Sequence, residues 1–104
     1  MAVEPELTIG ADPVGHIVKT KGVVGGKARI AGSRIRVMDV VAWYENGASV
    51  AEVIANFPSL TPADVHAAMA YYCDNRDEIE AQFAADERFE EEFRRLHPES
   101  VLDV

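Results

Sequence analysis

The sequence has a single cysteine and no long hydrophobic run. Cys73 alone cannot form an intrachain disulfide, which fits a reducing compartment. No apolar stretch approaches the ~20 residues that a membrane helix needs. The segment from Met1 to Gly10 is acidic, whereas a signal peptide has a basic and then an apolar segment. We therefore expect one globular domain of 104 residues that is cytoplasmic and makes no membrane contact.

Motifs for catalysis and for metal binding are lacking as well. The chain has no Cys-x-x-Cys, no His-Glu-x-x-His, no Walker loop and no dinucleotide fingerprint. His66 and Cys73 share one face of a predicted helix, but their seven-residue spacing places them about 10 Å apart, too far to chelate one ion. The sequence Gly25-Gly26-Lys27 is better explained by turns than by a phosphate loop. We expect no catalytic residue, no cofactor and no metal.

Acidic residues are missing from one segment and abundant in another, within a net charge of -8. From Lys19 to Arg36 there is no Asp or Glu, and the basic residues are Lys19, Lys21, Lys27, Arg29, Arg34 and Arg36. From Asp74 to the end there are eleven acids and four arginines. This separation of basic from acidic residues has two interpretations. The acidic segment is a solvated helix, or the two segments form two surfaces that serve two partners.

Residues 27–37, KARIAGSRIRV, alternate between polar and apolar except at a central Gly-Ser pair. This pattern predicts a β-hairpin with a two-residue type II′ turn, in which Arg29 pairs with Arg36 and the isoleucines face the core. Arg34 shares the outer face with both. Because like charges that face each other destabilise a strand pair, we expect an anion nearby: either the chain's own acidic C-terminal segment, or a phosphate backbone or acidic protein surface.

The segment from Val37 to Asn46 is predicted to be a short helix that Gly47 closes. It is apolar on nearly every side, so it is either the central helix of the domain or half of a dimer interface. We expect Trp43 and Tyr44 to be core aromatics.

Residues 49–72 carry two helix start signals separated by a stop. Ser49 and a glutamate three residues later form a capping box, and Pro58 ends the helix that follows. Thr61, followed by proline, begins a second helix. We expect that helix to continue to near Ala84. The pattern is that of a helix-turn-helix, although an ordinary helical hairpin carries the same local signals.

After a predicted break near Asp86, a short acidic helical segment carries phenylalanines out of phase with the preceding apolar stripe. Such side chains are not expected to remain in water, so they pack on the domain, on a second copy or on another protein. The candidate partner-binding residues are Phe83, Phe89, Phe93, Arg94, Arg95 and Leu96. The two arginines could enter an acidic nuclease centre, where a guanidinium pairs with carboxylates.

A helix-turn-helix raises the possibility of DNA binding. Only Thr61 and His66 could donate hydrogen bonds from the start of the second helix, where the neighbouring residues are small or acidic. We therefore expect phosphate contacts mainly from the basic hairpin, acting like the wing of a winged helix. The candidate DNA-binding residues are Lys19, Lys21, Lys27, Arg29, Arg34, Arg36, Thr61 and His66.

Residues 26–72 resemble the small bacterial and archaeal family catalogued as domain of unknown function 433. The similarity lies in GGKARIAGSRIRV, in a short helix that ends in Asn-Gly, and in SVAEVIANFPSLTPADVHAAMAYY. The chain departs from the usual family hairpin at Ala28, Arg29, Ala31, Ser33 and Arg36. The resemblance implies a dimeric DNA-binding repressor that is also the antitoxin of a type II toxin–antitoxin pair and neutralises a PIN-like ribonuclease toxin.

Together these observations predict a mainly α protein: a winged-helix-like, helix-turn-helix three-helix core with a small N-terminal β-hairpin and an extra C-terminal helix. We expect an irregular lead-in at 1–22 with a short strand near residues 16–19, the hairpin and helix-turn-helix domain at 23–84, and the acidic segment at 85–104. The expected function is a non-enzymatic, homodimeric antitoxin that binds its PIN-like toxin and represses its own operon. The alternative is a protein-interaction or self-association module that does not bind DNA.

Overall fold

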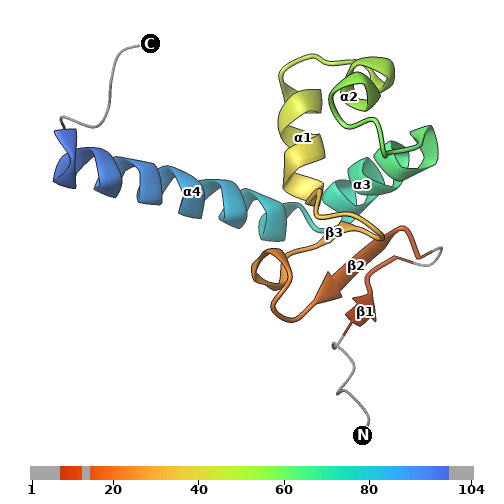
Figure 1. Cartoon of the computed structure of the whole chain (residues 1–104), viewed down its shortest axis with the longest axis horizontal. Helices are drawn as coiled ribbons and strands as arrows, with labels where there is room; N and C mark the ends of the chain where they lie inside the picture. The colour runs from red at the N-terminus through yellow and green to blue at the C-terminus, as the bar shows by residue number, and fades with distance from the viewer. Residues whose placement is uncertain (1–7, 13–14, 99–104) are drawn as a thin grey trace, which may run out of the picture.

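The computed structural model describes residues 8–12 and 15–98, and the parts of the predicted lead-in and acidic segment at 1–7, 13–14 and 99–104 lie outside the described residues. The chain is mainly helical with a small N-terminal antiparallel sheet, as predicted (Figure 1). In order, the elements are β1 (Thr8–Gly10), β2 (Ile17–Thr20), the 3-10 turn η1 (Val24–Gly26), β3 (Arg29–Ile30), α1 (Val37–Glu45), α2 (Val50–Asn56), α3 (Pro62–Asp74) and α4 (Arg76–Leu96).

The sheet has three strands in the order β1-β2-β3, where the sequence predicted only a hairpin and a short strand. The predicted short strand is β2. The hairpin is reduced: Arg29 and Arg36 form the predicted pair as an isolated bridge, and Ile30 N donates to Ile35 O (2.8 Å), but only Arg29–Ile30 forms a strand, paired with β2. Gly32 turns the chain with a φ of +83°, a conformation that favours glycine.

Helix α1 is buried over its first half only. Val37, Met38, Val40 and Val41 are all buried. The prediction that Trp43 and the following tyrosine are core aromatics is wrong, because they are 40% and 49% exposed. Periodicity placed the tyrosine on the same face as the valines, but the last turn of α1 extends past the part of the helix that the core covers.

Both predicted helix starts in the 49–72 stretch are confirmed. Ser49 Oγ accepts from Glu52 N (3.1 Å), and Glu52 Oε1 accepts from Ser49 N (3.0 Å). Thr61 Oγ1 accepts from Asp64 N (3.1 Å), while Asp64 Oδ2 accepts from Thr61 N (2.9 Å). These caps satisfy amides that the first helical turn leaves unpaired, so they fix where α2 and α3 begin.

The boundary between the last two helices differs from the prediction. Helix α3 ends at Asp74 and does not continue to near Ala84, and α4 runs unbroken through Asp86. Asn75 makes the break: its backbone is non-helical (φ -134°, ψ 43°), and its side-chain Nδ2 donates to Tyr71 O (3.0 Å). Asparagine readily competes with the helix for backbone hydrogen bonds in this way.

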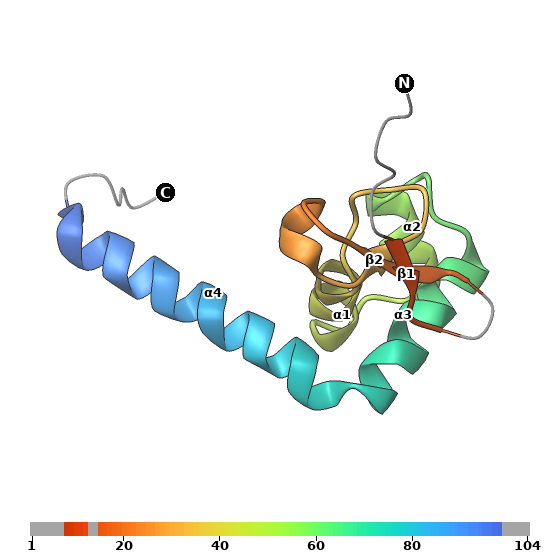
Figure 2. The ribbon, with the colours of Figure 1, turned by 90° about the horizontal axis from the view of Figure 1, so that it is seen from below.

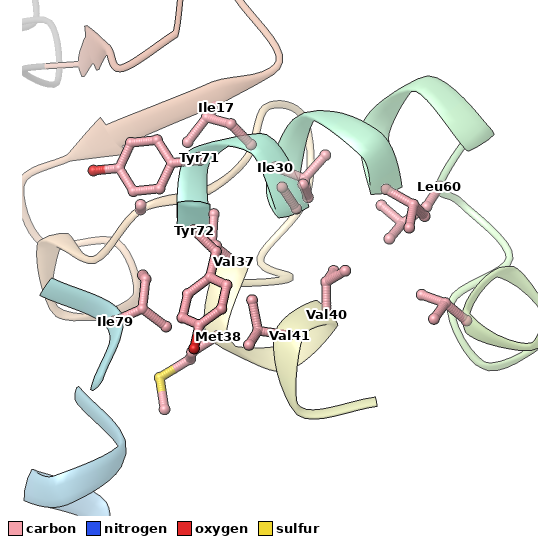
Figure 3. Close-up of a cluster of buried hydrophobic side chains, with 14 residues drawn as sticks. Ile17, Ile30, Val37, Met38, Val40, Val41, Leu60, Tyr71, Tyr72 and Ile79 are labelled. Atoms are coloured by element: carbon pink, nitrogen blue, oxygen red, sulfur yellow. The ribbon is translucent and has the colours of Figure 1, made fainter. Parts of the chain in front are cut away.

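Helix α4 has two unlike halves. Its first half packs on the other elements, with Ile79 fully buried (Figure 3). Phe83 is partly buried against the core. Its second half projects away from them (Figures 1 and 2). We call residues 86–96 the arm and the described residues up to 85 the body. Among the described residues, no helix is both long and apolar enough to cross a membrane.

The core lies where α1, α3 and the sheet meet. Residues from every layer contribute to it: Ile17 and Ile30 come from the sheet, Val40 and Val41 from α1, and Tyr72 from α3 (Figure 3). Removing such side chains from water is the main stabilising term in folding, about 1.5–3 kcal/mol for each large one. The core thus holds the body together, and the arm departs from it.

Candidate functional site

The direction of α4 is set by two adjacent tyrosines at the end of α3. Tyr71 donates its hydroxyl to Glu78 Oε1 (2.7 Å), and Glu78 Oε2 forms an ion pair with Lys19 Nζ on β2 (3.0 Å). Burial is the largest single influence and acts to lower the pKa of Lys19, but the hydrogen bonds and charge interactions with Glu78 and Tyr71 together outweigh it and raise this pKa. The pair therefore joins the sheet to the root of α4.

Tyr72 makes the second set of contacts. Its hydroxyl donates to Glu80 and accepts from Arg76 Nη1 (3.0 Å), and the Arg76 guanidinium lies 4.6 Å from the centre of the tyrosine ring. The hydrogen bond to Glu80 raises the pKa of Tyr72 to about 12. With its ring buried against α1 and its hydroxyl held by α4, Tyr72 fixes the first turn of α4 on the body.

Beyond this anchor, the arm exposes an apolar stripe. Phe89, Phe93 and Leu96 are 71%, 43% and 58% exposed. The Phe89 and Phe93 rings stack with centroids 6.5 Å apart, and His97 lies 4.7 Å from Phe93. The structure therefore brings three of the predicted partner-binding residues onto one uncovered surface. We call these three residues the arm stripe.

The other predicted partner-binding residues do not lie on the arm stripe. Phe83 packs against the core. At about 100° per residue, Arg94 and Arg95 point more than a quarter turn away from the centre of the stripe. Arg95 Nη2 also forms an ion pair with Glu92 Oε1 (2.6 Å). The arginines thus lie on a different side of the helix from the phenylalanines.

Half of the predicted DNA-binding cations have partners inside the chain. Lys19 pairs with Glu78, as described above. Arg29 donates from Nη1 to Ser33 O (2.9 Å) and from Nη2 to Thr20 Oγ1 (2.7 Å). Arg36 holds Asp39 in α1 through two side-chain hydrogen bonds (2.8 and 3.1 Å), which raise the pKa of this arginine. These three side chains brace the body.

The other three cations face outward. Lys21 and Arg34 are exposed and Lys27 is half-buried, and none of them forms an ion pair with a residue that the structure describes. They come from the loops on either side of η1 and β3 (Figure 1). We call these three residues the basic patch. Among the six cations of residues 19–36, these three are the ones available for contacts with phosphate.

The start of α3 offers little to a ligand. The Thr61 hydroxyl serves as the helix cap, whereas His66 is exposed. Asp64 accepts from Thr61 N and from His16 Nδ1 (2.8 Å), so it ties the sheet to α3. Burial acts to raise the pKa of Asp64, but the hydrogen bonds from Thr61 and His16 outweigh it and lower this pKa.

The sequence prediction missed an exposed aromatic patch at the end of α1. Trp43 lines an open hollow of about 240 Å³ with Ala42 and Asn46, and the next residue, Tyr44, is exposed as well. No local signal marks this patch, because a buried and an exposed aromatic fit the same helical period. No group of three His, Cys, Asp or Glu side chains suited to a metal ion exists among the described residues.

Comparison with known proteins places the chain in a family. The family model described as "Protein of unknown function (DUF433)" matches residues 17–72, more than half of the chain. A crystal structure of a DUF433 member protein from Anabaena variabilis ATCC 29413 is 43% identical in sequence, with a TM-score of 0.63, over 66% of this chain and 68% of that chain. A search of curated proteins finds no match. The matched region spans β2 to α3 and leaves out the arm, and on this evidence the chain belongs to the DUF433 family.

Proposed function

We propose that this protein is a non-enzymatic, antitoxin-like binding protein. In this proposal the arm binds and neutralises a PIN-like ribonuclease toxin, and the body binds operator DNA as a homodimer and represses the operon. The family resemblance supports the toxin–antitoxin role, and the exposure of the arm supports the proposed division of roles between arm and body.

The observation that carries the proposal is the arm stripe. Phe89, Phe93 and Leu96 lie together on a helix that leaves the body, and nothing in the described chain covers them. A helix of this kind suits binding in a groove of another protein, where it inserts side chains at i, i+4 and i+7. Water contact with three large apolar side chains is otherwise hard to account for.

The DNA part of the proposal is supported by the basic patch. Lys21, Lys27 and Arg34 could neutralise phosphates without breaking any ion pair of the body. A homodimer would present two such patches. The exposed Trp43 and Tyr44 at the end of α1 are the candidate dimer contact, since aromatic residues are enriched in interfaces.

Co-expression tests the toxin part. The chain is produced with the product of the neighbouring reading frame, which we expect to be a small nuclease with an acidic centre. The complex should copurify and show little ribonuclease activity. Phe89→Ala with Phe93→Ala should weaken binding at least about a hundredfold, since each buried aromatic anchor contributes roughly 2 kcal/mol or more. A nuclease that stays bound to this double variant and remains inhibited would refute the role of the arm.

Binding to the operon's own promoter at several salt concentrations tests the DNA part. Replacing Lys21, Lys27 and Arg34 by alanine should reduce the slope of log affinity against log salt by about 5 for the homodimer, because three cations in each of two protomers make six phosphate contacts and each contact contributes roughly 0.9. The matched control replaces Arg88, Arg94 and Arg95 by alanine, the same charge change on the arm, and should leave the slope nearly unchanged.

A second function has its own support. The outward residues near the start of α3 are small, and Asp64 and Thr61 are engaged with each other, so α3 presents a poor surface for reading base edges. This favours a protein-interaction or self-association module that does not bind DNA. Absence of promoter binding at low salt, together with retained binding of the nuclease, would select this function over the first.

A further inference from the structure

We propose that Asn46, which follows the last residue of α1, is a site of spontaneous covalent modification. The folded chain slowly converts this asparagine to a mixture of aspartate and isoaspartate, and fraying of the last turn of α1 sets the rate. The reaction consumes water and releases ammonia. The inference goes beyond the proposed function and does not rest on it, because it concerns the covalent chemistry of the chain itself.

The residue after Asn46 decides its reactivity. Gly47 follows Asn46, and no other asparagine of the chain is followed by glycine. The reaction begins when the backbone nitrogen of the following residue attacks the side-chain Cγ of the asparagine. Glycine has no Cβ, so its nitrogen approaches this carbon with little steric hindrance. Asn46 is therefore the asparagine that the sequence makes most reactive.

The end of α1 is open to water. Every residue from 43 to 47 is exposed, and Asn46 lines the open hollow beside Trp43. The buried half of α1 is its first half, and its last turn lies on the side of the body away from the sheet (Figure 1). Exposed helix ends with few buried contacts open far more often than the core does. Water and hydroxide therefore have access to the reacting groups.

Two hydrogen bonds hold the pair away from the reactive geometry. Asn46 Nδ2 donates to Ala42 O (2.8 Å), which turns the side chain back along α1. Gly47 N donates to Tyr44 O (2.9 Å). Both bonds must break before Gly47 N can lose its proton and reach Cγ. Because both lie in the last, exposed turn of the helix, the fold slows the reaction without preventing it.

The reaction balances with water alone. Hydroxide removes the proton of Gly47 N, this nitrogen bonds to Asn46 Cγ, the Cγ–Nδ2 bond breaks, and ammonia leaves. The product is a cyclic imide, which a water molecule then opens. Attack of water at Cγ gives aspartate. Attack at the backbone carbonyl carbon of residue 46 gives isoaspartate, in which the main chain runs through the former side chain.

Both products change the end of α1. Each adds a negative charge beside Glu45 at the C-terminal end of a helix, where the helix dipole disfavours an anion. Isoaspartate also lengthens the main chain by one carbon atom. The turn in which Ala48 N donates to Trp43 O (3.1 Å) cannot then keep its geometry. The modification therefore alters the surroundings of Trp43.

Asn56 is a matched internal control. It is exposed, and its Nδ2 donates to Glu52 O (2.9 Å), the same bond to a carbonyl four residues back, but Phe57 follows it. The full chain is incubated at mildly alkaline pH, at a low concentration at which a dimer does not shield the aromatic patch. Peptide mapping by mass spectrometry should show Asn46 converting at least about tenfold faster than Asn56, because the Cβ of Phe57 hinders attack. Equal rates, or no conversion at Asn46, would overturn the proposal.

Unfolding the chain tests the role of the last turn. In urea, Asn46 should convert at least about tenfold faster than in the native chain at the same pH, because the two hydrogen bonds no longer hold it. The rate at Asn56 in urea should remain well below that at Asn46. A rate at Asn46 that is the same in the native chain and in urea would overturn the proposed control by fraying.

The only tryptophan of the chain, Trp43, reports on the consequence. During incubation of the parent chain, its fluorescence emission should change in step with the appearance of isoaspartate. Asn46→Gln keeps a side-chain amide but closes the cyclic imide much more slowly, so this variant should form no isoaspartate at residue 46 and should keep its emission spectrum. An equal change of emission in the variant would overturn the proposed link between the modification and the end of α1.

Discussion

The two halves of α4 both carry large apolar side chains, but those of the first half are buried or partly buried and those of the second half are exposed. Ile79 is fully buried in the part of α4 that packs on the core, whereas Phe93, fourteen residues along the same helix, is 43% exposed and has ring contacts with Phe89 and His97. An apolar residue in the first half stabilises the fold. In the arm, an apolar residue is exposed and adds little to the stability of the body, and the proposed function assigns it a role in binding.

The largest predicted effect comes from a substitution at each of these two positions. Ile79→Ala should lower the free energy of unfolding by about 2–4 kcal/mol, because it removes buried methylenes and leaves a cavity. Phe93→Ala removes a larger side chain but should change the same free energy by less than about 0.5 kcal/mol. Urea unfolding followed by far-UV circular dichroism measures both.

If both variants lost a similar amount of unfolding free energy, the proposed difference between the two halves of α4 would be wrong. Such losses would show that the arm packs on the body, or on a second copy, in solution. Repeating the unfolding of Phe93→Ala at two protein concentrations separates these cases, since only a dimer contact depends on concentration.

The next largest effect is expected from removing the helix caps, which tests what determines where α2 and α3 begin. Ser49→Ala and Thr61→Ala should each lower the free energy of unfolding by about 1 kcal/mol, because each removes the side-chain acceptor of a first-turn amide. Ser59→Ala, at an exposed position in the α2–α3 connection, is the control and should have little effect. A neutral result for both caps would mean that tertiary packing alone determines where α2 and α3 begin.

The smallest predicted effect is a pH dependence within the body. Because the pKa of Asp64 is lowered on folding, the unfolded chain binds its proton more readily. The stabilisation by this group is therefore complete above its unfolded pKa of about 4 and is lost as the pH falls through the lower folded value. The difference in unfolding free energy between the parent and Asp64→Asn should narrow as the pH is lowered through this range. A difference that stays constant would contradict the assignment.

How much the sequence could predict depends on how local each feature is. The caps at Ser49 and Thr61 were correctly predicted, because both partners of each hydrogen bond lie within four residues. The end of α3 was not, since the apolar period continues past Asn75, and a single asparagine in such a pattern does not reveal that its side chain will take the carbonyl of Tyr71 and end the helix. Trp43 was misplaced because a period identifies a face of a helix and does not reveal how much of that face its neighbours cover.

In the candidate sites too, interactions between residues close in sequence could be predicted and those between distant residues could not. The outer arginines were predicted to need an anion, and Arg36 finds one three residues away in Asp39. The Lys19 to Glu78 pair joins residues far apart in sequence, and no sequence pattern reveals such a partner. Whether a cation is free for a ligand is thus a tertiary property, which is why the candidate set for DNA narrows to the basic patch.

The central claim is that the arm is a binding surface with little role in folding, and amide hydrogen exchange of the chain with and without the neighbouring nuclease tests it most directly. The account predicts fast exchange over residues 86–96 in the free chain, because these amides lie in an exposed helix end without tertiary contacts, and strong protection there in the complex. Protection that appears in the body and leaves residues 86–96 unchanged would contradict it.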